Sequence, residues 1–129
     1  MPIANDNCDT DVDLDFDEIY DQVAIINRQC EKEYGKKLTN IVFMGMGEPL
    51  RNQEAVEEAV AILVNPVAFA LAPSRVTVSS LGLPKEMLAV AERLPQVRLA
   101  LSLHAADDET RNPIMPINQR HNLAELRAA

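Results

Sequence analysis

Apolar residues recur along this chain with the periods of helices and strands in turn. Three segments place them every three or four positions, which predicts helices with one apolar face. These residues are Ile19, Val23, Ile26 and Cys30 in the first segment, Ala55, Val56, Ala59, Val60 and Leu63 in the second, and Met87, Leu88, Ala91 and Leu94 in the third. Short aliphatic runs between and after them predict strands over 41–44, 75–79 and 97–103.

The first two predicted helices have recognisable start and stop signals. Asp15 and Glu18 have the spacing of a capping box, and Gly35 follows the last apolar position of that helix. Asn52 is placed to cap the second helix, and Asn65-Pro66 ends it, because proline disfavours a helical conformation in the residue before it.

The second half of the chain carries similar signals. Gly82 and Pro84 predict a turn, with Pro84 in the first turn of the third helix. We predict loops over 66–74 and from His104-Ala105 onward, and Asn122 is placed to cap a fourth helix beginning at Leu123.

The resulting order, α-β-α-β-α-β-α, is typical of right-handed βαβ units around a parallel sheet, so we predict an α/β fold. The strand over 41–44 is apolar at every position, which favours a central place in that sheet. Three strands are too few to close a (β/α)₈ barrel.

Composition and length narrow the class of protein. The 129 residues allow one domain, and the absence of Trp, with two Tyr and three Phe, predicts an aliphatic core. No apolar run approaches the roughly 20 residues of a membrane span, and the N-terminus lacks the pattern of a secretory signal. We expect no membrane association and a cytoplasmic or organelle-matrix location.

Residues 1–14 are rich in aspartate and are expected to form an acidic flexible tail, with the folded part spanning 15–129. A calcium-binding loop starting at Asp9 would need Gly at its sixth position, where Leu14 stands. The net charge of −8 argues against a nucleic-acid-binding surface on this segment, because phosphate contacts need clustered Lys and Arg.

The stretch from Asn40 to Leu50 holds the strongest functional signal. An apolar strand stops at Gly45-Met46-Gly47, and Glu48 and Pro49 follow directly. Glycine allows close approach of the backbone to a ligand because it has no Cβ. A carboxylate after such a strand lies at the edge where parallel α/β proteins bind ligands.

The other two strands also end in polar residues. Ser79 and Ser80 close one, and Ser102 and His104 close the other. A carboxylate accepts hydrogen bonds from an ammonium group, and hydroxyls bond a carboxylate or a ribose, so the set suits a zwitterionic small molecule. The alternative is that these are ordinary turn and capping residues.

Several other chemistries are excluded by the sequence. It has no G-x-S-x-G nucleophile elbow, no Walker loop, and no third glycine after Gly45 and Gly47. Cys8 and Cys30 form neither a zinc site nor a CxxC pair, and no three ligands stand at metal-binding spacing. Cys30 is expected in the core, on the apolar face of the first helix.

Three ordered motifs resemble one family. Residues 41–50 resemble the Gly-Met-Gly-Glu-Pro-Leu segment of the RlmN-type radical S-adenosylmethionine (SAM) methyltransferases, and residues 75–79 resemble their second strand. Residues 101–105, with Asp108-Glu109-Thr110-Arg111 and Met115-Pro116-Ile117-Asn118, resemble their third strand and the following loop. The resemblance extends from about Asp15 to the end of the chain.

The resemblance implies a partial (β/α) barrel from an enzyme that methylates C2 of an adenine in large-subunit (23S) ribosomal RNA and, in some members, transfer RNA. It implies that Gly47 and Glu48 meet the amino group of SAM. Its other implied SAM contacts, through side chain or backbone, are Ser79, Ser102, Leu103 and His104.

The departures from the family are equally informative. Its 4Fe–4S cluster is held by Cys-x-x-x-Cys-x-x-Cys, and the matching region before Asp15 contains only Cys8. The family's methyl-carrying Cys, its resolving Cys and a downstream Asn would follow Ala129, and its basic RNA-binding domain is also missing. Leu81 stands where the family usually has a small polar residue.

Three hypotheses follow. The first is a central fragment of an RlmN-type enzyme that carries part of the SAM pocket, is inactive alone, and needs the remaining portion of the enzyme to act on RNA. The second is a non-catalytic module that binds SAM or a partner. The third is an α/β remnant without a ligand. None assigns a catalytic residue or a metal ligand to this chain.

Overall fold

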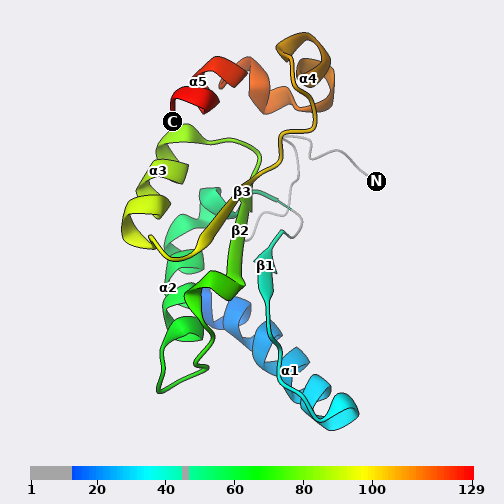
Figure 1. Cartoon of the computed structure of the whole chain (residues 1–129), viewed down its shortest axis with the longest axis vertical. Coiled ribbons are helices and arrows are strands. Elements are labelled where there is room, and N and C mark those ends of the chain that lie inside the picture. The colour runs from blue at the N-terminus through cyan, green and yellow to red at the C-terminus, as the bar shows by residue number, and fades with distance from the viewer. Residues whose placement is uncertain (1–12, 45–46) are drawn as a thin grey trace.

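The structure is a computed structural model that describes residues 13–44 and 47–129. Helices and strands alternate along the chain (Figure 1). The elements are α1 (Phe16–Tyr34), β1 (Ile41–Phe43), η1 (Pro49–Asn52), α2 (Gln53–Val64), η2 (Pro73–Arg75), β2 (Val76–Ser80), α3 (Pro84–Arg93), β3 (Arg98–Leu101), α4 (Asp108–Ile114), η3 (Pro116–Gln119) and α5 (Leu123–Ala128), where η marks a 3-10 helix.

The three strands form a parallel sheet in the order β1-β2-β3, which confirms the predicted α/β fold. The prediction that the first strand is central was wrong, because among the described residues β1 pairs only with β2. The apolar sequence of β1 suggested burial on both faces, but the Val42 side chain is 52% exposed because β1 is an edge strand. An apolar run indicates burial on both faces only when neighbouring elements cover both faces.

The core lies between one face of the sheet and helices α2 and α3, which Figure 1 shows on the same side of the strands. Val76 and Val78 of β2 are fully buried there and pack with Val60 of α2 and Val90 of α3. Side chains alternate between the faces of a strand, so Thr77 and its neighbour Val42 lie on the opposite face. That face is only partly covered.

Two predicted helix faces need correction. On α3, Leu88 and Ala91 are exposed, and Val90 is the buried residue instead. On α1 no residue is fully buried: Ile26 is about half exposed and Cys30 is only partly covered, so the expectation of a core cysteine was wrong. The helix period was right in both cases, but the packing partners set how much of each face is covered.

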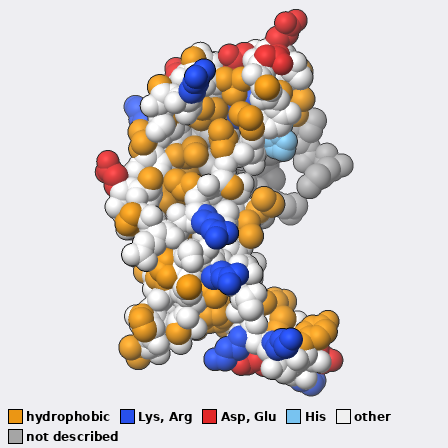
Figure 2. All heavy atoms as spheres, in the orientation of Figure 1, with side chains coloured by type: hydrophobic (Ala, Val, Ile, Leu, Met, Phe, Trp, Pro, Cys, Tyr) orange, Lys and Arg blue, Asp and Glu red, His pale blue; other side chains and the backbone are white. Residues whose placement is uncertain are grey.

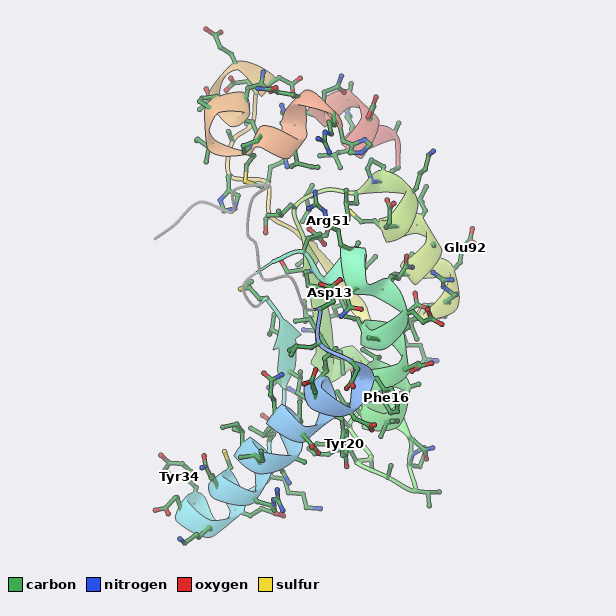
Figure 3. The ribbon with its side chains drawn as sticks, turned by 180° about the vertical axis from the view of Figure 1, so that it is seen from behind. Asp13, Phe16, Tyr20, Tyr34, Arg51 and Glu92 are labelled. Carbon is green, nitrogen blue, oxygen red and sulfur yellow. The ribbon has the colours of Figure 1, made fainter. Side chains whose placement is uncertain are left out.

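The position of helix α1 explains why its side chains are little buried. Its N-terminal half packs against α2, with Phe16 and Tyr20 on this side, while its last turns project away from the rest and leave Tyr34 exposed (Figure 3). The predicted capping box of Asp15 and Glu18 is present. Gly35 ends the helix in the left-handed conformation, with φ +65°.

Three further predictions concern where helices begin, and one of them is confirmed. Asn52 precedes α2 but makes no capping bond, and its amide instead donates to the Leu14 carbonyl at 2.6 Å. The loop predicted after His104 contains helices α4 and η3; α4 is capped by Asp107, whose carboxylate accepts from the Thr110 N–H at 2.8 Å. Asn122 caps α5 as predicted.

The distribution of charge on the surface and the character of the helices complete the description of the fold. Lys and Arg side chains on the face seen in Figure 2 fall into separate groups among hydrophobic and uncharged atoms. Within residues 13–44 and 47–129, no helix has the length and apolar character needed to cross a membrane. The predicted tail lies mostly outside the described residues, as does Cys8.

Candidate functional site

The parallel strands end at one edge of the sheet, which we call the rim and define as residues 47–48, 79–82 and 102–104. All six residues predicted from the sequence to meet a ligand belong to this edge. Hydrogen bonds join its three parts directly. The geometry therefore brings the predicted residues together, while ligand contact by each remains a prediction.

Glu48 connects the end of β1 to the end of β2. Its Oε1 accepts a hydrogen bond from the Leu50 N–H at 3.0 Å and caps η1, and its Oε2 accepts from the Leu81 N–H at 2.6 Å. A carboxylate offers about four lone-pair sites, so the two backbone bonds leave room for a further donor such as an ammonium group. Sequence reasoning gave Glu48 only the ligand role and missed this structural one.

Gly47 lies beside Glu48 with φ +118°, in a region that side-chain-bearing residues rarely adopt. Among the described residues, and apart from its chain neighbours, a Cβ placed on it would meet no atom within 4 Å. The backbone here is therefore open to close approach. The other two residues of the predicted Gly-x-Gly turn, Gly45 and Met46, lie outside the described residues.

Ser79 and Ser102 form the centre of the rim. Their hydroxyl oxygens are 3.3 Å apart, across the β2–β3 boundary, with Ser79 buried and Ser102 half-buried. Ser80 instead shapes the turn after β2, since its hydroxyl accepts from the Gly82 N–H and its carbonyl accepts from the Ser102 N–H at 2.8 Å. The structure therefore distinguishes the two paired hydroxyls from the serine that forms the turn. The sequence alone did not distinguish them.

Leu103 and His104 end the rim in a tight turn. The Ala105 N–H donates to the Leu103 carbonyl at 2.8 Å, and His104 between them has φ +60°. A non-glycine residue in this conformation costs on the order of 1–3 kcal/mol and persists only where surrounding contacts hold it. Both side chains are exposed, so this strained turn presents its groups to solvent at the predicted site.

Arg111 of α4 lies behind the rim and was not predicted as a site residue. It is fully buried, donating from Nε to the Leu103 carbonyl at 2.9 Å and from Nη2 to the Leu81 carbonyl at 2.8 Å. Its Nη1 donates to Oδ1 of Asn118. The motifs containing Arg111 and Asn118 were noticed in the sequence, but nothing there showed that they reach back to the strand ends.

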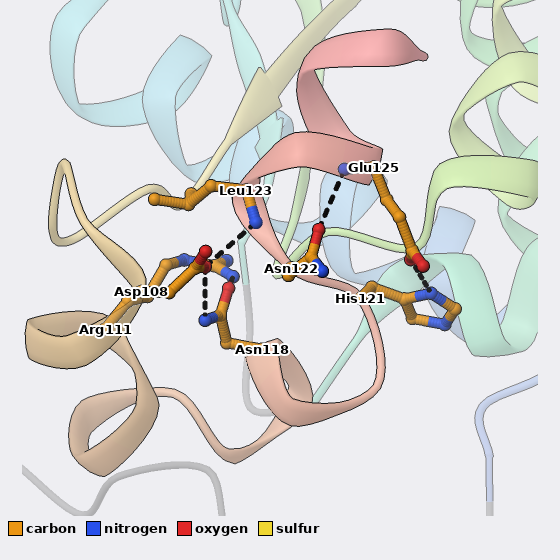
Figure 4. A network of polar contacts seen from close by, with 7 residues as sticks. All are labelled: Asp108, Arg111, Asn118, His121, Asn122, Leu123 and Glu125. Carbon is orange, nitrogen blue, oxygen red and sulfur yellow. Dashed lines mark hydrogen bonds and ion pairs between the residues drawn. The ribbon is translucent and has the colours of Figure 1, made fainter.

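A second layer of polar contacts holds Asn118 (Figure 4). Its amide nitrogen donates to Oδ1 of Asp108 and to Oδ1 of Asn112, both at 2.8 Å. The Leu123 N–H also donates to Oδ1 of Asp108, and this bond, followed by that of Asn118, lowers the pKa of the Asp108 carboxyl. Burial lowers the pKa of Arg111, and the nearby charge of Asp108 opposes that shift.

The residues present do not fit an iron–sulfur cluster. Such a cluster is held by several thiolates, and the chain contains two cysteines, of which Cys30 is a free thiol on α1. In the described part of the chain, no three His, Cys, Asp or Glu side chains are arranged to hold a metal ion.

A hollow of about 350 Å³ lies apart from the rim, lined by residues of α1 and the segments near Lys37 and Phe69. It shares no residue with the rim. A small molecule held there would contact different residues from one held at the rim.

Comparison with known proteins places the chain clearly. No protein-family model matches it. It is 48% identical over 109 residues to a protein from Ruthia magnifica and 47% identical over 117 residues to one from Sorangium cellulosum, both named dual-specificity RNA methyltransferase RlmN. These matches cover 84% and 90% of this chain but 30% of each relative, so the chain spans about a third of their length.

A solved structure agrees with these relatives. The crystal structure of a radical SAM methyltransferase from Sphaerobacter thermophilus superimposes with a TM-score of 0.84 at 41% sequence identity. The match covers 89% of this chain and 33% of that one.

Proposed function

We propose that this chain, which belongs to the RlmN-type radical SAM methyltransferase family by sequence and fold, forms one side of a SAM pocket at its rim. In the complete enzyme this pocket would serve methylation of C2 of an adenine in 23S ribosomal RNA and, as a second substrate, in transfer RNA. The chain alone would be inactive, with RNA and the remaining portion of the enzyme as its partners.

One observation carries the proposal: the Ser79–Ser102 hydroxyl pair and the Glu48 carboxylate stand at the same edge of one parallel sheet. SAM carries an ammonium group, a carboxylate and a ribose. The lone pairs of Glu48 that the Leu50 and Leu81 N–H groups do not use suit the ammonium group, and serine hydroxyls suit the carboxylate or ribose. The open backbone at Gly47 would admit the ligand closely.

Catalysis would need thiolates that this chain does not contain. SAM bound at the rim would supply the methyl group and, beside an iron–sulfur cluster, the radical chemistry of the family. Because the cysteines here do not fit such a cluster, the role assigned to this chain is to bind and orient SAM. A non-catalytic module that binds SAM or a partner remains the alternative, and both share the same pocket.

Calorimetric titration of the chain with SAM tests the pocket. Removing the half-buried hydroxyl in Ser102→Ala should weaken binding by about 0.5–1.5 kcal/mol, the usual contribution of one hydrogen bond. Ser74→Ala, at an exposed serine outside the rim, is the matched control and should bind like the parent. Absence of SAM binding by the folded parent, or equal affinity in the two variants, would contradict the proposal.

The fragment and the module differ in a second experiment. Mixing the chain with a polypeptide that carries the Cys-x-x-x-Cys-x-x-Cys motif and the family's remaining segments should restore RNA methylation if the chain is part of an enzyme. SAM binding without any restored methylation would favour the module.

A further inference from the structure

We propose that Arg111 is a positioning residue for the SAM site, acting through the backbone of Leu81 and Leu103 rather than by touching the ligand. The inference deepens the proposed function and rests on it. The family resemblance gives this residue no role. Its three donor groups, and the atoms that accept from them, indicate one.

The guanidinium joins the ends of two strands. Nη2 donates to the carbonyl of Leu81, just after β2, and Nε donates to the carbonyl of Leu103, just after β3. The planar fork of arginine holds donors at fixed angles, so it fixes both carbonyls relative to one another. A lysine at this position has a single ammonium group and cannot reproduce that geometry.

Leu81 is held from both of its polar groups. Its N–H donates to Glu48 and its carbonyl accepts from Arg111. The polar path Glu48–Leu81–Arg111–Leu103 therefore crosses all three strand ends. A shift of Arg111 would move Leu81, whose N–H also orients the Glu48 carboxylate.

The second contact supports the strained turn. The Leu103 carbonyl accepts from both Arg111 Nε and the Ala105 N–H, and His104, with φ +60°, lies between the two residues of that turn. A positive φ at histidine needs surrounding contacts to hold it. Arg111 is a buried contact that reaches this turn from another element, so it sets how residues 103 and 104 face the pocket.

The electrostatic cost of Arg111 also favours this role. Its side chain is fully buried and donates to two carbonyls and an amide oxygen, while the carboxylate of Asp108 is reached through Asn118. Buried charges are expensive, and apolar replacements often stabilise a core equally well. The charged guanidinium between the two strand ends is therefore better explained by the carbonyl groups that it holds in position than by a contribution to stability.

The test compares SAM affinity at matched stability. Arg111→Lys should weaken SAM binding by about tenfold in calorimetry. This loss is about the contribution of one hydrogen bond to a charged group, because the polar groups of the site would be imperfectly placed. Val90→Ala, in the core on α3 and away from the rim, should lower the melting temperature while leaving the SAM dissociation constant unchanged. Circular dichroism confirms that both variants are folded at the titration temperature.

A measurement on the parent protein makes the test independent of folding in the variant. The Nε–H signal of Arg111 in a ¹H–¹⁵N spectrum should shift when SAM is added, because its acceptor belongs to the turn that meets the ligand. An unmoved signal at SAM saturation would overturn the inference, and so would equal SAM affinity in the parent and Arg111→Lys. A parent that binds no SAM would instead overturn the proposed function beneath it, so the two failures are distinguishable.

Discussion

Removing the Glu48 carboxylate should destabilise the fold even in the absence of any ligand. The carboxylate accepts two backbone hydrogen bonds, from Leu50 at 3.0 Å and from Leu81 at 2.6 Å. Hydrogen bonds to charged groups contribute about 1.5–3 kcal/mol each when well shielded, and Glu48 is only partly buried. We therefore expect Glu48→Ala to lower the free energy of unfolding by about 2–4 kcal/mol.

Urea unfolding followed by circular dichroism measures this change. Glu48→Gln keeps one acceptor oxygen and should lose about half as much, because its NH₂ group would face a backbone N–H. Glu92→Ala is the matched control: Glu92 is an exposed residue of α3 (Figure 3), and its removal should change stability by less than about 0.5 kcal/mol. If Glu48→Ala were as stable as Glu92→Ala, the link between β1 and β2 through Glu48 would be refuted.

The same variant also bears on the ligand role. Glu48→Ala should weaken SAM binding by about 1.5–3 kcal/mol beyond its effect on folding, as expected for a lost charge-assisted hydrogen bond. The affinity must be measured where the variant is fully folded. Equal affinity of the folded variant and the parent would leave Glu48 with its structural role alone.

Three further predictions concern other parts of the molecule. Gly82→Ala should lower the free energy of unfolding by about 1–3 kcal/mol in urea titrations, because φ is +111° and the new Cβ would lie 3.0 Å from Cδ2 of Leu126; unchanged stability would contradict this reading. The folded pKa of Asp108 is lowered from 3.8, so its stabilising effect is present above 3.8 and is lost as pH falls through the lower folded value. Asp108→Asn should therefore show a smaller loss of stability on acidification than the parent, and an equal loss would refute it. The β1 edge, with Val42 and Met44 exposed, should promote self-association in sedimentation, and Val42→Lys should reduce it; a monodisperse parent would count against this.

The sequence predicted the elements well where local signals decide them. The capping box at Asp15, the αL glycine at Gly35 and the proline at Pro84 all depend on nearby residues, and each marks a helix end in the structure. The parallel sheet followed from the alternation of helices and strands. These features need no knowledge of distant contacts.

The failures share a cause in long-range packing. Val42 was placed in a central strand because every position of that strand is apolar, and Cys30 was placed in the core because it follows the apolar period of its helix. The exposure of both residues depends on which elements lie opposite. Helix α4 was read as loop because its seven residues include Asn112 and Pro113 and lack an apolar period. The signal that could have found it was the cap at Asp107.

The site shows the same division. The convergence of Glu48, Ser79 and Ser102 could be predicted, because parallel strands end at one edge. The roles of Arg111 and Asn118 could not, because their partners are backbone carbonyls and side chains brought near only by the fold. Sequence reasoning finds groups placed at strand ends more readily than the buried contacts that hold those ends in place.

A SAM titration followed residue by residue in ¹H–¹⁵N spectra tests the SAM pocket most directly. We predict that amide signals of Gly47, Leu81, Ser102 and His104 shift together and saturate, while Tyr34 at the far end of α1 stays unmoved. The absence of any shift, or shifts confined to residues such as Asn27 and Phe69 around the separate hollow beside α1, would contradict a SAM pocket at the rim.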